Sequence, residues 1–183
     1  MPHSAYAIAN YFLDKALSTG KQLTQIHVQK LVFYSHGWHL ALDEAGRPLI
    51  AEPIEAWRYG PVVRSLYREF AEFGSNPINR KARDVRAFRT ADGRLGVSMV
   101  EPSIDNEQPN DINRELVIAI LDRAWEIYGN LSAYQLSNMT HAENEPWQII
   151  QKAFGEHLPR GLNIPNETIR DCFRQKLQGQ PGS

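Results

Sequence analysis

Several features that mark whole classes of protein are missing from this chain of 183 residues. It has a single cysteine, Cys172, so no disulfide can form within it. No run of about 18 apolar residues occurs, which argues against a membrane-spanning helix. The first thirty residues show a helical repeat of apolar positions, whereas a signal peptide has a charged start, an apolar run and a cleavage site. These absences predict a cytoplasmic protein without a membrane partner.

An excess of charge of one sign is also lacking. Twenty Lys and Arg residues against 21 Asp and Glu residues leave a net charge of −1, so no overall field would hold the chain on nucleic acid, and a charged partner would need a local patch. Apolar residues make up 42% of the chain, as in ordinary globular domains. We expect one domain over residues 1–178, with an insertion at about 75–110, and a flexible tail at 179–183.

Motifs of catalysis are absent as well. The sequence has no GxxxxGK[ST] phosphate loop, no GxSxG elbow, no HExxH helix, no paired CxxC and no GxGxxG. His36 and His39, with the later His141, are the best candidates for a metal site. His39 falls within the apolar arc of its helix, however, which favours a packed core histidine. We therefore predict no catalytic residue, metal or cofactor, and keep a metal-dependent enzyme using these three histidines as an alternative.

Helical periodicity is the strongest positive signal. Apolar residues recur at three- and four-residue spacing, and several helix ends are marked by capping residues. Ser4 can cap the first helix and Thr24 the second, Asp111 a later one, and Ser132 with Gln135 forms a capping box. This pattern predicts a mainly α fold, a compact domain of about six or seven helices with a small β-hairpin insertion.

The segment around residue 57 is different. The segment 49–57 is too short and too rich in β-tolerant residues to predict a helix, and Pro53 favours a short or edge strand. Tyr59, Gly60 and Pro61 then read as a turn, in which Gly60 takes a conformation that other residues reach only with strain. Because proline suits the first turn of a helix, we expect a helix to begin at Pro61.

The insertion at 75–110 lacks a helical period. Alternating Leu95, Val97 and Met99, after the turn signal Asp92-Gly93, predict a hairpin that pairs back to residues 85–89. Its segment 80–94 has a charge balance of +4, carried by Arg80, Lys81, Arg83, Arg86, Arg89 and Arg94. These cations could bind phosphates of nucleic acid, but acidic residues follow directly, at Glu101, Asp105, Glu107 and Asp111. A self-paired, solvated hairpin is favoured; a nucleic-acid-binding regulator and an acidic protein partner stay open.

Three sequence blocks resemble a known family. The blocks LVFYSHGWHLAL, IEAWRYGPVVRSLYREF and HAENEPW, at 31–42, 54–70 and 141–147, are similar to the Panacea domain. That family includes SocA-type antitoxins and phage-associated GepA-like proteins. The resemblance covers about two-thirds of the chain, from residue 6 to 147, and the WxYGPV portion is its most specific part.

The resemblance implies an antitoxin of a bacterial or phage toxin–antitoxin system that neutralises a cognate protein toxin by direct binding. At least one relative acts as an adaptor that delivers its toxin to a bacterial protease, so a protease complex is a further possible partner. Structural roles are implied for the family-motif residues Trp38, His39, Gly60, Pro61, His141, Pro146 and Trp147. Aromatic and basic residues are the candidates for partner binding: Trp57, Tyr59, Arg83, Arg86 and Arg89. The oligomeric state is not determined by the sequence.

Overall fold

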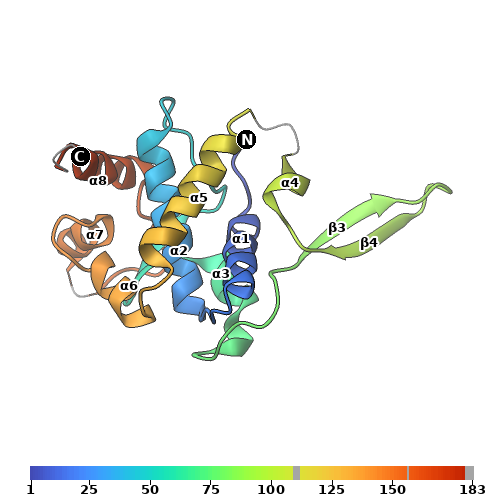
Figure 1. The fold of residues 1–183 in the computed structure, drawn as a ribbon, viewed down its shortest axis with the longest axis horizontal. Coiled ribbons are helices and arrows are strands. Elements are labelled where there is room, and N and C mark those ends of the chain that lie inside the picture. The colour runs from blue at the N-terminus through green and yellow to red at the C-terminus, as the bar shows by residue number, and fades with distance from the viewer. Residues whose placement is uncertain (109–111, 156, 180–183) are drawn as a thin grey trace.

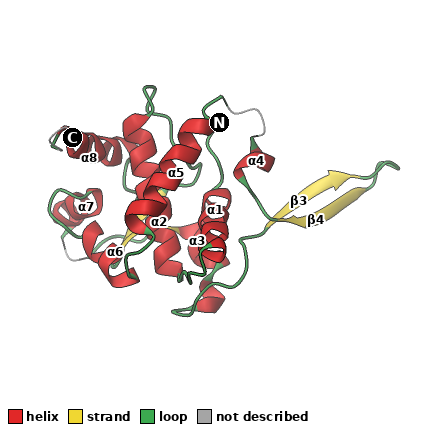
Figure 2. Ribbon diagram, viewed as in Figure 1, coloured by secondary structure: helices red, strands yellow, loops and turns green. Residues whose placement is uncertain are grey.

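A computed structural model of the chain describes residues 1–108, 112–155 and 157–179. These residues form eight α-helices, one short 3-10 helix and two antiparallel β-hairpins (Figures 1 and 2). The predicted mainly α class with a small β insertion is confirmed. The helix beyond the predicted seven is α4, Ile104–Glu107, a single turn within the insertion. The predicted cap Asp111 lies outside the described residues, and so do residues 180–183 of the predicted tail.

Helix α2, Gln25–Leu42, lies at the centre of the fold. Helices α1 (Ala5–Ser18), α5 (Arg114–Tyr128), α6 (Ala133–Thr140) and α8 (Asn166–Gln178) pack around it (Figure 1). Because it is covered on several sides, α2 buries polar residues as well as Leu31 and Val32. A helix buried all round shows little amphipathic character.

The helix ends follow the predicted capping chemistry. The Ser4 hydroxyl accepts a hydrogen bond from the Ala7 amide at 3.1 Å. Ser132 and Gln135 cap α6 reciprocally, each side chain bonding to the other residue's backbone N–H. Such side chains satisfy amides that have no partner within the helix. Helix α7, Pro146–Phe154, begins with the proline that the sequence places there.

The first hairpin corrects one prediction. Strand β1, Ile54–Trp57, pairs with β2, Gly60–Val63, with Ala56 opposite Pro61. Pro61 therefore lies in a strand, and helix α3, Arg64–Glu69, begins three residues later than expected. The prediction was wrong because proline suits an edge strand, where its missing N–H costs no ladder bond, as well as a first helical turn. The 3-10 helix Ala71–Phe73 follows α3.

The second hairpin confirms the predicted pairing. Strand β3, Asp84–Arg89, runs antiparallel to β4, Leu95–Val100, with Val85 opposite Met99 and Arg89 opposite Leu95. The two strands form an arm that projects from the helical body (Figure 1). Among the described residues, no helix is long and apolar enough to cross a membrane.

Candidate functional site

Two neighbouring polar residues of α2 hold the β1–β2 hairpin in place. The amide group of Gln29 donates to the Val63 carbonyl at 3.0 Å and accepts from the Val63 N–H at 2.8 Å. The Lys30 ammonium donates to the carbonyls of Tyr59 and Pro61 at 3.2 and 3.1 Å. Lys30 is only 2% exposed, and burial lowers its pKa to about 7. Neither residue was predicted from the sequence, because lysine and glutamine on a helix ordinarily lie at the surface.

Gly60 is required by the space around it. It has φ +106, a conformation that favours glycine. A Cβ at this position would lie 2.5 Å from Lys30 Nζ and 2.7 Å from Thr140 Oγ1. The backbone of the hairpin thus approaches α2 and α6 more closely than any side chain would permit. The special conformation predicted for Gly60 is present, and the close contact with Lys30 adds a second constraint.

The C-terminal motif packs against the same hairpin. The Trp147 indole donates to the Trp57 carbonyl at 2.7 Å. The rings of His141 and Trp147 lie 4.1 Å apart, and Pro146 begins the helix that carries Trp147. Motif residues that are 90 positions apart in sequence, Trp57 and Trp147, therefore meet at one junction.

The other two family-motif residues lie further along α2. The Trp38 indole donates to the Tyr128 hydroxyl at 3.0 Å, and its ring packs on Phe173 at 4.9 Å. His39 Nδ1 lies 3.0 Å from the Arg47 carbonyl. Both residues link α2 to neighbouring segments, away from the hairpin junction.

The three candidate histidines each have their own polar partner. His36 Nε2 is 2.9 Å from Asn166 Oδ1, His39 contacts the Arg47 carbonyl, and His141 Nδ1 is 2.7 Å from the Ser137 carbonyl. Burial lowers the pKa of His36 to about 4 and also lowers the pKa of His39. Within the described part of the chain, no three His, Cys, Asp or Glu side chains are grouped so that they could hold a metal ion.

A groove of about 1080 Å³ lies beside the hairpin junction. Its walls come from β1, α3, α7 and the segment that follows α7. Aromatic and basic side chains dominate its lining, namely Trp57, Tyr67, Trp147, Arg58, Arg64, His157 and Arg160. Trp57 was predicted from the sequence; the three arginines were not, because the segments that carry them are far apart in the chain. Tyr59, also predicted, lies in the adjoining turn and is exposed.

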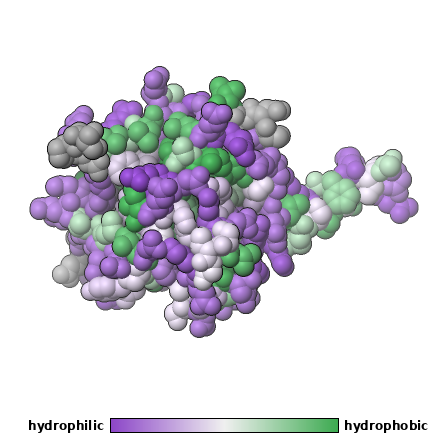
Figure 3. Space-filling view, in the orientation of Figure 1, coloured by the Kyte–Doolittle hydropathy of each residue, from purple (hydrophilic) through white to green (hydrophobic). Residues whose placement is uncertain are grey.

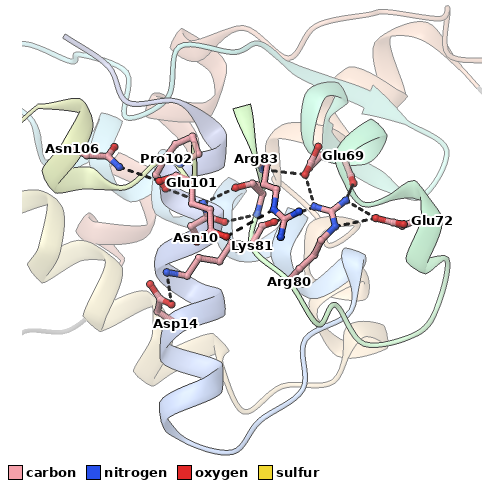
Figure 4. A network of polar contacts seen from close by, with 11 residues as sticks. Asn10, Asp14, Glu69, Glu72, Arg80, Lys81, Arg83, Glu101, Pro102 and Asn106 are labelled. Atoms are coloured by element: carbon pink, nitrogen blue, oxygen red, sulfur yellow. Dashed lines mark hydrogen bonds and ion pairs between the residues drawn. The ribbon is translucent and has the colours of Figure 1, made fainter. Parts of the chain in front are cut away.

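The arm is anchored at its base by buried and paired groups. The Asn10 side chain of α1 donates to the carbonyls of Ala82 and Pro102 and accepts from the Ala82 N–H, which joins both strands of the arm to the body. Arg80 forms ion pairs with Glu69 and Glu72, and Lys81 with Asp14 (Figure 4).

The remaining cations of the arm are exposed. Arg83 lies 3.9 Å from Glu101, Arg86 lies 4.0 Å from Glu107 and Arg94 lies 3.1 Å from Asp92. Arg89 donates to the Gly93 carbonyl and has no carboxylate partner among the described residues. Five of the six basic residues at 80–94 thus have an acidic neighbour. This arrangement agrees with the predicted self-paired hairpin and leaves a weak field for phosphates.

One face of the arm carries large apolar side chains that are exposed to solvent. Side chains alternate across a strand, so the register places Val85, Ala87 and Arg89 of β3 on the same face as Leu95, Val97 and Met99 of β4. The four large apolar residues of this face, Val85, Leu95, Val97 and Met99, are 59% to 72% exposed. We call these four residues the apolar face of the arm. On the other face the Phe88 ring covers Gly96, where a Cβ would lie 2.6 Å from the ring. Figure 3 shows hydrophobic surface along the arm.

Comparison with known proteins defines the class. Residues 28–148 match the family described as "Antitoxin SocA-like, Panacea domain". This interval contains both hairpins, the buried pair Gln29 and Lys30, and the junction of Trp147 with Trp57. The chain therefore belongs to the SocA-like Panacea family of antitoxins.

A particular relative extends the likeness beyond that interval. Antitoxin SocA of Caulobacter vibrioides (strain NA1000 / CB15N) is 33% identical over 173 residues, which cover 93% of this chain and 82% of that protein. No solved structure matches the chain significantly.

Proposed function

We propose that this protein neutralises a cognate protein toxin by binding it directly, and that the arm formed by β3 and β4 supplies the main contact. The observation that carries the proposal is the apolar face of the arm. An exposed apolar patch on a soluble protein marks an interaction surface, and a two-stranded hairpin without a covered face is only marginally stable in water. A toxin seated on this face would bury it.

The charges of the arm favour protein over nucleic acid as its ligand. A nucleic-acid interface needs several cations free to contact phosphates, whereas Arg80 and Lys81 are held by carboxylates at the base. Arg89 lies at the outer end of the same face as the apolar residues, and Arg86 lies on the opposite face. These exposed arginines, together with Arg83 at the base of the arm, can pair with carboxylates of the toxin at the rim of the contact. Tyr59 and Trp57 lie in the other hairpin and are assigned no toxin contact in this proposal.

Binding requires no chemistry of the antitoxin. Membership in an antitoxin family and the lack of catalytic motifs both support a non-enzymatic role. Neutralisation by binding is stoichiometric, so protection should end when toxin exceeds antitoxin. Delivery to a protease would instead lower the amount of toxin in the cell.

Co-expression with the gene adjacent to its own, where we expect the toxin to be encoded, tests the proposal. We expect wild-type protein to restore growth and to co-purify with the toxin at unchanged toxin levels. Val97→Asp together with Met99→Asp should abolish both, because carboxylates on the apolar face would be buried without partners. Ser98→Asp, on the opposite face of the same strand, is the matched control and should retain both.

Three other outcomes would contradict the proposal. Rescue by the double variant would remove the arm from the interface. Rescue with falling toxin levels and no stable complex would point to a proteolytic adaptor. Loss of DNA binding on charge reversal at Arg83, Arg86 and Arg89, with rescue intact, would make the arm a nucleic-acid-binding regulatory element.

A further inference from the structure

The groove beside the hairpin junction is far from the arm. Helix α7, which forms one of its walls, lies on the opposite side of the helical body from β3 and β4 (Figure 1). A partner held by the arm would therefore leave the groove open. Nothing in the proposed contact between toxin and arm uses its aromatic and basic lining.

The basic residues of the groove differ in how they are paired. Arg64 donates two hydrogen bonds to the Glu55 carboxylate, at 2.8 and 2.7 Å. Arg58 lies over the Tyr59 ring at 5.5 Å, and neither Arg58 nor Arg160 has a carboxylate partner within the described part of the chain. No Asp or Glu is among the described residues that line the groove. Arg58 and Arg160 therefore present guanidinium groups to the groove, and no carboxylate among its described lining residues pairs with them.

The aromatic wall is held rigidly by the same network. Glu55 is buried, and it accepts from the Trp57 indole at 2.8 Å as well as from Arg64. The Trp57 ring packs on Tyr67 at 4.8 Å and lies beneath the Arg64 guanidinium at 5.7 Å. The hydrogen bonds from Arg64 keep the pKa of Glu55 below its usual value, so the Glu55 carboxylate stays charged. A wall that is already in place loses little conformational entropy when a ligand binds.

We propose that this groove binds an acidic peptide segment of a protein partner, in which carboxylates flank an aromatic or aliphatic side chain. Guanidinium groups bind carboxylates through paired, charge-assisted hydrogen bonds, and Trp57 and Tyr67 offer flat apolar surface to the flanking side chain. A strand of nucleic acid fits less well, because it needs a continued track of cations along its phosphates. The arm carries the other basic cluster, and that cluster is mostly paired and lies on the opposite side of the molecule.

Selection from a library of random peptides on the full-length protein tests the proposal. We expect the wild type to enrich peptides with Asp or Glu beside Phe, Tyr, Trp or Leu. A synthetic copy of an enriched peptide should bind at least about tenfold more weakly to Arg58→Glu and to Arg160→Glu. The same peptide with Gln and Asn in place of its acids should also lose binding. Arg58 and Arg160 are exposed and make no ion pair with any residue that the structure describes, so both variants should keep the wild-type melting temperature.

Arg123→Glu is the matched control. Arg123 is an exposed arginine on α5 outside the groove, and its substitution changes the net charge by the same amount as Arg58→Glu or Arg160→Glu. Binding by this variant should match the wild type. Failure to enrich acidic peptides, equal losses in all three variants, or binding of single-stranded oligonucleotide in place of peptide would each overturn the proposal. Loss of toxin binding in the arm variants would leave it unaffected, so the two proposals can fail separately.

Discussion

The two hairpins are built from the same secondary structure and have opposite surroundings. The β1–β2 hairpin lies against α2, where Gln29 and Lys30 satisfy its backbone and Trp147 bonds to its Trp57 carbonyl. The β3–β4 arm is joined to the body at its base through Asn10, and its strands are exposed. The first hairpin is therefore part of the core of this antitoxin, while the second is free to change its contacts.

Substitution of Gly60, the first residue of β2, and of Gly93, in the turn between β3 and β4, tests the contrast between the two hairpins most directly. Gly60→Ala should lower the free energy of unfolding by about 3 kcal/mol, because φ +106 is strained for alanine and its Cβ would clash with Lys30 and Thr140. Gly93 has φ +84 and nothing within 4 Å of a Cβ, so Gly93→Ala should cost only the backbone strain, about 1 kcal/mol. Urea unfolding of both variants measures the difference. Equal losses would show that the surroundings of Gly60 do not matter.

The buried Lys30 beneath the first hairpin makes the stability of the protein depend on pH near neutrality. Its pKa is about 7 in the folded protein and about 10.5 in an unfolded chain, so the unfolded state binds more protons between these values. Stability should therefore rise with pH, by roughly 1 to 2 kcal/mol from about pH 7 to about pH 8.5. Cys172 begins to ionise in the unfolded chain near the top of this range, and this opposes part of the rise, because burial raises the pKa of its thiol in the folded protein. In Lys30→Met, chemical unfolding at the two pH values should show little of this rise; an equal rise would assign it to another group.

The bond from Trp147 to Trp57 ties the C-terminal motif to the first hairpin. Trp147→Phe should cost about 1 to 2 kcal/mol, because it leaves the Trp57 carbonyl without this donor. Trp125→Phe, at a similarly buried tryptophan that stacks on Phe12, is the control for the smaller ring. Thermal unfolding should rank the Trp147 variant below the Trp125 variant. The opposite order would mean that the indole hydrogen bond contributes nothing measurable.

The smallest effect on stability is expected on the arm. Val97→Asp should change the free energy of unfolding by about 0.5 kcal/mol or less, because Val97 is mostly exposed and covers no core residue. Calorimetry of the free protein checks this value. A loss above about 2 kcal/mol would show that the apolar face is packed in the free protein, and the contrast between the hairpins would disappear.

Local signals in the sequence determined the helix ends and the arm. Ser4 and Ser132 cap helices through bonds to residues three positions away, and Asp92-Gly93 with alternating apolar residues produced the strand pairing of β3 with β4. These interactions depend on neighbours in the chain, so propensity and spacing are sufficient to predict them. The same alternation did not reveal that the apolar face of the arm is bare, because exposure depends on what the rest of the chain covers.

Tertiary structure alone decided the role of residues whose partners are distant in sequence. Pro61 suits both a helix start and an edge strand, and the presence of Ile54–Trp57 beside it selected the strand. Lys30 is buried because α1, α5, α6 and α8 surround α2. Backbone carbonyls of the hairpin accept hydrogen bonds from its ammonium group. The groove joins Arg58, Trp147 and Arg160, which no local pattern relates. Burial and the meeting of remote charges are properties of the packed chain, and a single sequence carries no direct signal for them.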